Sequence, residues 1–299
     1  MTTARRPTQP ATPRSSTAGP AGTQPAAPRT PASADLALLA GRLTDRDRHL
    51  CRLLREHRVL TTSQIRDLAF GSLNVAQHRL VALARLGVLD RFRPVWPHGD
   101  GSAPWDYVLG PAGAAVLAAE QATTPAQLGY RHDRTLAIAH SQRLGHQVGV
   151  NGFFTALAAR TRHHTGAELV AWLSERACAE RWGHVVRPDG YGHWRDPTGE
   201  VDFFLEYDTG TEPLERLLAK VDAYTELATA TEIDTPVLLW LPGPGREAGF
   251  HQALGHPDIT ITLATAAAHL ADHPAGRVWL VAGQAGPRQT LASLGDLPA

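Results

Sequence analysis

Apolar side chains recur at helical spacing three times in the first third of the chain. The first run follows Thr44, a good N-cap, and keeps its leucines on one face as far as His57. The second run opens with the capping-box pattern of residues 61–64, Thr-Thr-Ser-Gln. The third follows Ser72 and stops at Gly87. The pattern predicts three short helices.

Two strand-like segments follow these helices. Residues 88–93 and 105–109 have strand character, and the stretch between them, 97–102, is rich in turn residues. Three helices followed by a β-hairpin is the order of a winged helix-turn-helix, which we expect in residues 36–122. The third helix of that fold enters the major groove of DNA. Its exposed polar positions, with side chains suited to reading bases, are Asn74, Gln77, His78 and Arg85.

The net charge is zero, but its distribution along the chain is uneven. Residues 1–93 hold 15 arginines against six acidic residues, whereas the remaining 206 residues hold 14 basic against 23 acidic ones. A basic front part suits binding to a polyanion, so we expect double-stranded DNA as its partner. The arginines expected to contact phosphates are Arg46, Arg52, Arg55, Arg66, Arg91 and Arg93. Winged helices also mediate dimerisation or protein docking, and this alternative stays open.

The rest of the chain alternates apolar runs with helical segments. A long amphipathic helix is predicted over residues 134–159. Strands are expected at 168–172, 184–187, 201–207, 236–241, 259–263 and 277–281, and helices at 213–229, 246–255 and 263–272. This alternation favours an α/β sandwich with a mixed sheet in residues 123–299, so the whole chain is α/β, or α+β overall.

The N-terminal tail and the cysteines bear on the cellular compartment. Residues 1–35 are rich in Ala, Pro, Thr, Ser, Gly and Arg, and we expect them to be disordered. Neither a secretory signal nor an apolar stretch of about 18 residues is evident, so no membrane association is expected. Cys51 and Cys178 lack metal-ligand spacing and suit reduced thiols in a cytoplasmic protein.

Acidic residues gather around the strand predicted at 201–207. Asp189 precedes this strand, and Glu206 and Asp208 are two residues apart, which places both on one face of it. Mg²⁺ commonly binds through one or two carboxylates together with water and phosphate. We therefore expect Asp189 and Glu206, with Asp208 as a further candidate, to hold a Mg²⁺ ion that polarises a phosphate and generates hydroxide. The alternative is a strand end capped by solvated acids.

The chain contains one lysine, Lys220, against 28 arginines. It follows Asp208 by twelve residues, on the helix expected after the strand. A compact ammonium can serve where the planar guanidinium of arginine cannot. We expect Lys220 to reach the attacking water or the phosphate, with Arg187 or Glu175 completing the site. Chance survival of one lysine under codon bias is the alternative.

The segments that carry these residues resemble the replication-relaxation family of actinobacterial plasmids and mobile elements. The likeness spans roughly residues 43–265 and rests on five segments: Arg-Pro-Asp-Gly at 187–190, Glu-Tyr-Asp-Thr-Gly-Thr-Glu at 206–212, the helix with Lys220 and Tyr224, the wing sequence at 102–113, and Val-Asn-Gly-Phe-Phe at 150–154. It implies a DNA-binding protein that relaxes or processes plasmid DNA, with plasmid replication or transfer proteins as further partners.

The back part is also similar to PD-(D/E)xK nucleases, in which a proline–aspartate pair precedes a Glu-x-Lys strand. Asp208 stands where that pattern has its lysine, and some nuclease-like families place the lysine on the following helix, as with Lys220. The resemblance implies a restriction-endonuclease-like sandwich with Asp189, Glu206, Asp208 and Lys220 as catalytic residues. Two other hypotheses stay open: a non-catalytic regulator with a degenerate nuclease-like domain, and a protein-docking adaptor. The pattern does not determine the oligomeric state.

Overall fold

The computed structural model describes residues 33–93, 104–231, 233–255, 259–284 and 286–297. The tail expected to be disordered lies outside these ranges except for its last three residues, which belong to helix α1 (Ser33–Arg42). The turn-rich stretch at 97–102 also lies outside them. Within the described ranges, no helix is long and apolar enough to cross a bilayer.

The three helices predicted in the front part are present with the predicted caps. Helix α2 (Asp45–His57) begins at a capping box that Thr44 forms with Asp47, and α3 (Thr62–Ala69) begins at the box that Thr61 forms with Gln64. The Ser72 side chain accepts a hydrogen bond from the third residue of α4 (Leu73–Arg85). These caps satisfy backbone N–H groups that a helix start leaves unpaired, which is why local sequence predicts the starts well.

A small antiparallel sheet follows. Its strands are β1 (Leu60–Thr61), β2 (Leu89–Phe92) and β3 (Asp106–Leu109), with β3 in the centre. Helix α5 (Pro111–Glu120) closes this part of the chain. Its Gly113 allows a close approach, because a Cβ there would lie 2.3 Å from the carbonyl oxygen of Val88. One apolar core joins α1 to α5 with this sheet.

The second part is built on a six-stranded mixed sheet in the order β4-β5-β6-β7-β8-β9. Its strands are β4 (Glu168–Ser174), β5 (Gly190–Asp196), β6 (Gly199–Tyr207), β7 (Val237–Leu241), β8 (Leu263–Ala267) and β9 (Leu280–Val281). Strands β6, β7 and β8 run parallel, and the other neighbouring pairs are antiparallel. The mixed sheet expected from the sequence is therefore confirmed.

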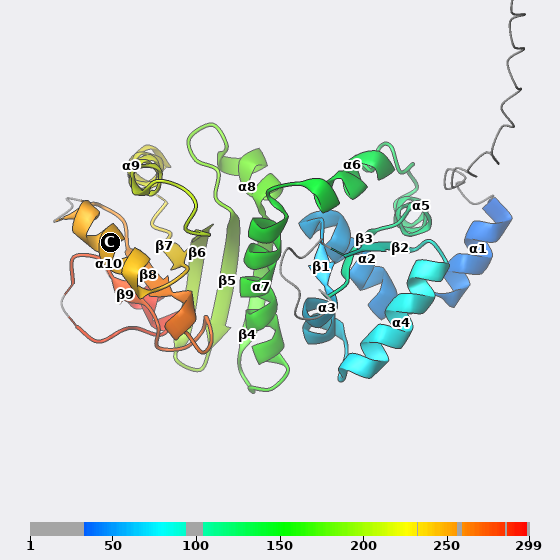
Figure 1. Ribbon diagram of the computed structural model, residues 1–299, viewed down its shortest axis with the longest axis horizontal. Coiled ribbons are helices and arrows are strands. Elements are labelled where there is room, and N and C mark those ends of the chain that lie inside the picture. Colours follow the sequence, from blue (N-terminus) through cyan, green and yellow to red (C-terminus); the bar gives the residue numbers. More distant parts are fainter. Residues whose placement is uncertain (1–32, 94–103, 232, 256–258, 285, 298–299) are drawn as a thin grey trace, which may run out of the picture.

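Helices cover both faces of this sheet (Figure 1). Helix α7 (Leu144–Thr161) packs on one face through Phe153, Phe154 and Leu157, and residues 275–294 extend the same apolar core. Helices α9 (Leu214–Thr231) and α10 (Pro244–Leu254) pack on the other face. The alternation of side chains along β6 separates the two cores, since Phe203 and Leu205 face α7 whereas Phe204 faces α9.

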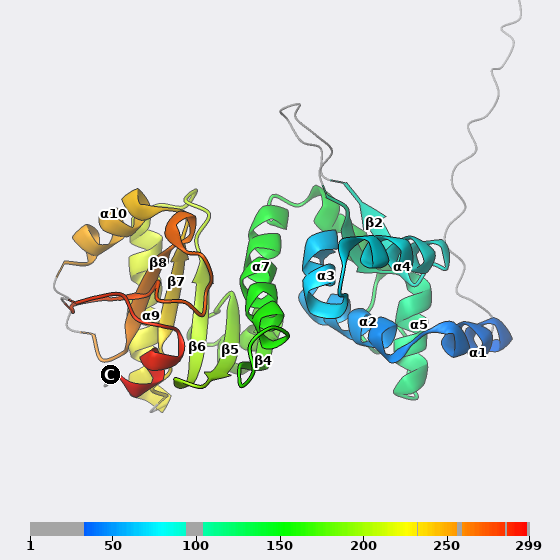
Figure 2. The ribbon, with the colours of Figure 1, turned by 90° about the horizontal axis from the view of Figure 1, so that it is seen from below.

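Helix α7 also joins the two parts of the chain. Both ribbon views place it between the sheet and the N-terminal helices (Figures 1 and 2). The amide of Asn151, which is fully buried, donates to the carbonyl oxygens of His57 at 3.1 Å and Val59 at 2.5 Å. The His57 ring stacks on Trp172 of β4 with centroids 3.6 Å apart. Polar and aromatic contacts therefore fix the two parts against each other.

Four predicted elements were wrong. One is the strand expected over 259–263, in which only Leu263 belongs to a strand, the first residue of β8. The helix expected over 134–159 is interrupted, giving α6 (His132–Leu136), a 3₁₀ turn over 137–140, and α7. The break comes at Ser141, whose side chain accepts from the N–H of Arg143 and so competes with a continuous helix.

The other two errors concern strands. Residues 184–187 follow α8 (Glu175–Trp182) as a turn rather than a strand, and the strand begins at Gly190. The helix expected over 263–272 is instead strand β8 and a short 3₁₀ turn, Ala268–Leu270. Its alanines favour helix locally, but this segment is completely buried between β7 and β9, and tertiary context decides.

Asn151→Ala should destabilise the protein by about 2 kcal/mol, because it removes two donors from buried carbonyl oxygens. Gly145→Ala is the control on the same helix: its position is exposed, an added Cβ meets nothing within 4 Å, and no destabilisation is expected. Denaturant unfolding of both variants measures the difference. Equal stability of the two would show that Asn151 does not hold the parts together.

Candidate functional site

The predicted acidic residues lie where strand β5 begins and strand β6 ends. These strands are antiparallel neighbours, and Gly190 pairs with Leu205. Asp189 precedes β5 directly, and its backbone N–H donates to the carbonyl oxygen of Leu205 at 3.1 Å. The sheet register therefore brings Asp189 next to Glu206, although 17 positions separate them in sequence.

Glu206 is buried, with 1% of its surface exposed. One of its carboxylate oxygens accepts from the Lys220 ammonium, and the other accepts from the Tyr224 hydroxyl at 2.6 Å. Lys220 and Tyr224 are four residues apart on α9, so they project from the same face of that helix. The single lysine of the chain thus pairs with the most deeply buried acid of the predicted cluster.

Asp189 is held from the opposite side of the sheet. Its Oδ2 atom lies 3.1 Å from Nε2 of His146 on α7 and accepts from the backbone N–H of Tyr207 at 2.8 Å. The His146 and Tyr207 rings meet edge to face. Gly149 makes room for this arrangement, since a Cβ there would lie 2.4 Å from the Tyr207 ring.

Asp208, the third predicted carboxylate, has other partners. It follows the end of β6, and its side chain accepts from Nε of Arg246 on α10 at 2.6 Å and from the N–H of Gly210 at 2.8 Å. The carboxylate of Asp208 is therefore neutralised by arginine, while Glu206 is paired with lysine. Binding an ion at Asp208 would require breaking the Arg246 pair.

The surroundings of Asp189 and Glu206 shift the pKa values of the two carboxyl groups in opposite directions. Burial, and then the charge of Asp189, raise the pKa of Glu206 to about 8 against the opposing effects of Lys220 and Tyr224. Burial acts on Asp189 in the same direction, but the hydrogen bond from His146 and the charge of Lys220 outweigh it and hold the pKa of Asp189 below its usual range. The surroundings therefore favour the ionised form of Asp189 and oppose ionisation of Glu206.

The two cationic partners respond to the same charges. Burial alone would lower the pKa of His146, but its hydrogen bond to Asp189 raises it. Burial also opposes the charge on Lys220, but the charges of Glu206 and Asp189 outweigh it and raise the pKa of the ammonium. The two carboxyl groups therefore favour the charged forms of both Lys220 and His146.

A cavity of about 650 Å³ opens over these groups. Asp189, Lys220 and Asp208 line it, whereas Glu206 is not among the lining residues and is buried behind them. Both residues expected to complete the site line it as well, Glu175 and Arg187. The remaining cationic side chains around the cavity come from both parts of the chain: Arg58, Arg143, His146 and Arg216.

The side chains around the cavity limit which metal ion the site could hold. Among the residues that the structure describes, no group of three or more His, Cys, Asp and Glu side chains is placed to hold an ion. Asp189 lines the cavity and Glu206 lies buried behind it, and two carboxylates suit an ion of the Mg²⁺ type that keeps several waters and takes phosphate oxygens as further ligands. For Glu206 to serve as a ligand, Lys220 must release its oxygen.

The residues predicted to contact DNA lie on the front part. Asn74, Gln77, His78 and Arg85 are all exposed on α4. Two apolar side chains beside them are exposed as well, Leu73 by 43% and Val75 by 54%. The face of α4 that points away from the core is thus uncovered in the described part of the chain.

The arginines predicted to contact phosphates have mixed surroundings. The guanidinium groups of Arg91 and Arg93 stack over the Trp105 ring, at 4.2 and 4.3 Å from its centroid. Arg66 is paired with Asp67, and Arg52 lies 3.5 Å from Glu120. Arg91 and Arg93 are exposed at the end of β2, so they remain the best placed of the set.

A comparison with protein families matches the replication-relaxation model over residues 51–238. This match covers more than half of the chain and includes the second half of α2, all of α3 and α4, and the site at Asp189, Glu206 and Lys220. The chain belongs to the replication-relaxation family. Neither the comparison with curated proteins nor that with solved structures gave a match. Membership supports a role related to plasmid replication.

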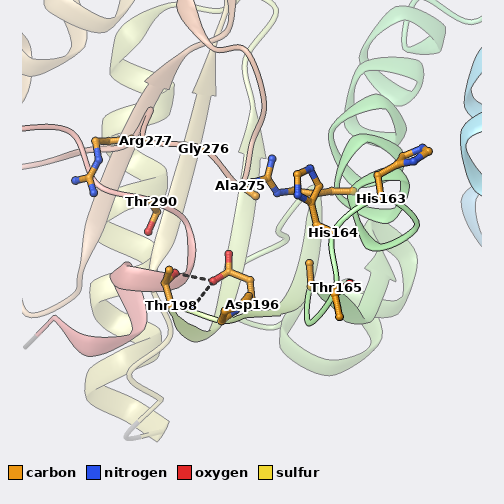
Figure 3. Close-up of a pocket in the computed structure, with 12 residues that line it drawn as sticks. His163, His164, Thr165, Asp196, Thr198, Ala275, Gly276, Arg277 and Thr290 are labelled. Carbon is orange, nitrogen blue, oxygen red and sulfur yellow. Dashed lines mark hydrogen bonds between the residues drawn. The ribbon is translucent and has the colours of Figure 1, made fainter.

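A second hollow of this family member, about 550 Å³, lies away from the acidic cluster (Figure 3). His163 and His164 line it after the end of α7, together with Asp196 and Thr198 from the turn between β5 and β6. The Asp196 carboxylate accepts from both the N–H and the hydroxyl of Thr198 and is thereby used within its own turn. None of the residues predicted to act on DNA lies here.

Several residues of the site were not singled out by sequence reasoning. His146 lies within the helix predicted over 134–159, where a polar helix face accounts for it, and Tyr224 entered only through the family resemblance. The pairing of Arg246 with Asp208 had no signal, because 38 positions separate them and the pair forms only when α10 docks. The one sequence signal for these residues was the polar side chain of His146 in a helix whose other side chains pack mainly on the core.

The raised pKa of Glu206 predicts a pH dependence of stability. Between its ordinary value of 4.5 and about 8, the folded state holds a proton that the unfolded state has lost. The contribution is therefore complete below pH 4.5 and disappears as pH rises through 8. The stability of the wild type relative to Glu206→Gln should fall across this window, on the order of 1 kcal/mol per pH unit.

Chemical denaturation at several pH values between 5 and 8 measures that difference. His146, whose pKa is raised by its hydrogen bond to Asp189, is present in both proteins, so the comparison reports on Glu206. A difference that stays flat or increases with pH would show that Glu206 is already ionised in the folded state.

Proposed function

We propose that this protein binds double-stranded DNA through its N-terminal part and nicks it in a divalent-metal-dependent reaction at Asp189, Glu206 and Lys220. The observation that carries the proposal is that Asp189 and the only lysine of the chain line one cavity, while the buried Glu206 pairs with that lysine directly behind it. The order α7, β4, α8, β5, β6, α9 and β7 around a mixed sheet supports a restriction-endonuclease-like arrangement.

In this mechanism Asp189 and Glu206 would hold a Mg²⁺ ion, which would supply polarisation of the scissile phosphate and a water of lowered pKa. The residues of the chain do the rest. His146 and the Tyr207 N–H fix the Asp189 carboxylate, and Tyr224 fixes Glu206. Lys220, released from Glu206, donates to a phosphate oxygen on which negative charge develops.

For DNA binding we propose a winged helix whose third helix is α4. The exposed face of α4 and the arginine pair on Trp105 at the end of β2 support this assignment. Asn74 and Gln77 would read bases in the major groove, and Arg91 would contact phosphate. Such a protein would relax supercoiled plasmid DNA by nicking it, and plasmid replication or transfer proteins would be its further partners.

A second function is favoured by one specific observation. Both oxygens of Glu206 already have protein partners, so the site forms a complete buried ion pair without a metal. Such a site without an open metal position is expected in a non-catalytic regulator that uses a degenerate nuclease-like domain as a binding platform. The two functions differ in whether Lys220 leaves Glu206 when a divalent ion and DNA are present.

Nicking of supercoiled plasmid in Mg²⁺ or Mn²⁺ tests the enzymatic function. Asp189→Asn and Glu206→Gln should abolish nicking and also the rise in melting temperature that a native-state metal ligand causes. Lys220→Ala should reduce nicking by about 100-fold or more while sparing the metal-induced shift, because an ammonium is no ligand for Mg²⁺. Lys220→Arg should also be impaired, since a planar guanidinium cannot occupy the same space.

Glu200→Gln is the matched control for Glu206→Gln. It removes a carboxylate from the same face of β6, but Glu200 is exposed and remote from the cavity. Its nicking and melting behaviour should equal those of the wild type. Full activity of Lys220→Arg, or a wild type that neither binds metal nor nicks DNA, would reject the nuclease in favour of the binding platform.

The winged helix is tested by titrating the full chain with duplex DNA at several salt concentrations. Affinity should fall steeply between about 50 and 200 mM salt. Asn74→Ala and Gln77→Ala should each cost about 1–3 kcal/mol on the preferred sequence only, whereas Arg91→Ala should weaken binding to all sequences alike. Arg195→Ala, an exposed arginine on β5, should change nothing. Binding that ignores salt would contradict the proposal.

A further inference from the structure

Arg58 is an arginine of the N-terminal part that reaches the cavity of the C-terminal part. It follows the last residue of α2 and lines the 650 Å³ cavity together with Asp189 and Lys220. Its side chain is exposed, and within the described ranges it has neither a hydrogen-bond acceptor nor an ion-pair partner. The guanidinium of Arg58 is therefore available to a ligand that enters the cavity.

The backbone at Arg58 is strained. Its φ is +70° and its ψ is −49°, and the N–H of Val59 donates to the carbonyl oxygen of His57 at 2.8 Å. These values describe a γ-turn of the rare form with positive φ, which is energetically costly for a residue with a Cβ. In the described part of the chain, Ala122 is the one other residue besides glycine with positive φ.

The C-terminal part holds this turn from two directions. Asn151 of α7 donates to the carbonyl oxygens of His57 and Val59, the two residues that flank Arg58. Trp172 of β4 stacks on the His57 ring. Strained backbone persists where its surroundings impose it, and such positions cluster at functional sites. The turn therefore directs Arg58 toward the cavity at an energetic cost.

Arg58 also lies where two cavities meet. A neighbouring cavity of about 510 Å³ contains Arg55, Tyr130, Arg131, Arg134 and Arg176. It shares five lining residues with the cavity of the acidic site: Arg58, Arg143, Gln147, Glu175 and Arg187. The two form a continuous groove in which arginines outnumber carboxylates and to which the half-buried rings of Tyr130 and Tyr207 contribute. A positively charged groove with aromatic rings is the composition that tracks a single nucleic-acid strand along its phosphates.

We infer that Arg58 binds a phosphate of a single DNA strand lying in this groove, so that the N-terminal part supplies a positioning residue to the site of the C-terminal part. The inference rests on the DNA-binding half of the proposed function and not on cleavage. The strained turn, held by Asn151, is the device that places the guanidinium.

The test compares four variants of the full chain in a binding assay with a fluorescent single-stranded oligodeoxynucleotide of about ten nucleotides, in EDTA so that no cleavage occurs. Arg58→Ala and Arg58→Gly should both weaken binding about five- to tenfold and reduce the slope of log affinity against log salt by about 0.7, the value for one phosphate contact on a single strand. Arg58→Lys should retain part of the affinity. Arg195→Ala, which removes an exposed arginine of β5 outside the groove, should change affinity less than twofold.

The melting temperatures of the same variants test the turn. Arg58→Ala keeps the strained φ, whereas Arg58→Gly relieves it, so the glycine variant should melt higher than the alanine variant while binding equally weakly. Wild-type affinity in Arg58→Ala and Arg58→Gly, a loss no larger than that of Arg195→Ala, or no binding by the wild type would overturn the inference. Loss of plasmid nicking in the wild type with this binding pattern intact would reject the nuclease alone.

Discussion

The burial of the Glu206 carboxylate is the constraint on which the C-terminal part depends. A carboxyl group with 1% exposure cannot stay there without partners, because removing its charge from water costs several kcal/mol. Lys220 and Tyr224 supply both partners from adjacent turns of α9, and Tyr224 also packs on Phe204 with ring centroids 5.3 Å apart. The same side chains of α9 therefore hold this helix on the sheet and provide the partners of Glu206.

Helix α7 extends this dependence to the rest of the molecule. Near its start His146 fixes Asp189, and one and a half turns later Asn151 fixes the end of α2. Gln64 of α3 donates to the carbonyl oxygen of Val148 between these two positions, and Arg162 beyond the end of α7 donates to that of Phe70. Helix α7 thus connects the proposed DNA-reading part directly with the acidic cluster.

Local sequence predicts those features that local interactions determine. The caps at Thr44, Thr61 and Ser72 were found because a side chain there bonds an N–H group three residues away. The acidic cluster was found from strand spacing, and Lys220 from composition. Strand β8 was missed because its alanines favour helix until burial between two strands overrides them. The strained turn at Arg58 had no signal at all, because Asn151, 93 positions away, imposes it.

The central claim is that Lys220 exchanges Glu206 for phosphate when a divalent ion binds. Crystals of the protein grown with Mn²⁺ and an oligodeoxynucleotide carrying an uncleavable phosphorothioate give the most direct measurement, by anomalous diffraction at the manganese edge. The account predicts a peak about 2.0–2.3 Å from carboxylate oxygens of both Asp189 and Glu206, with the Lys220 ammonium moved to a phosphate oxygen. A DNA-bound structure without such a peak, in which Lys220 still pairs with Glu206, would contradict it.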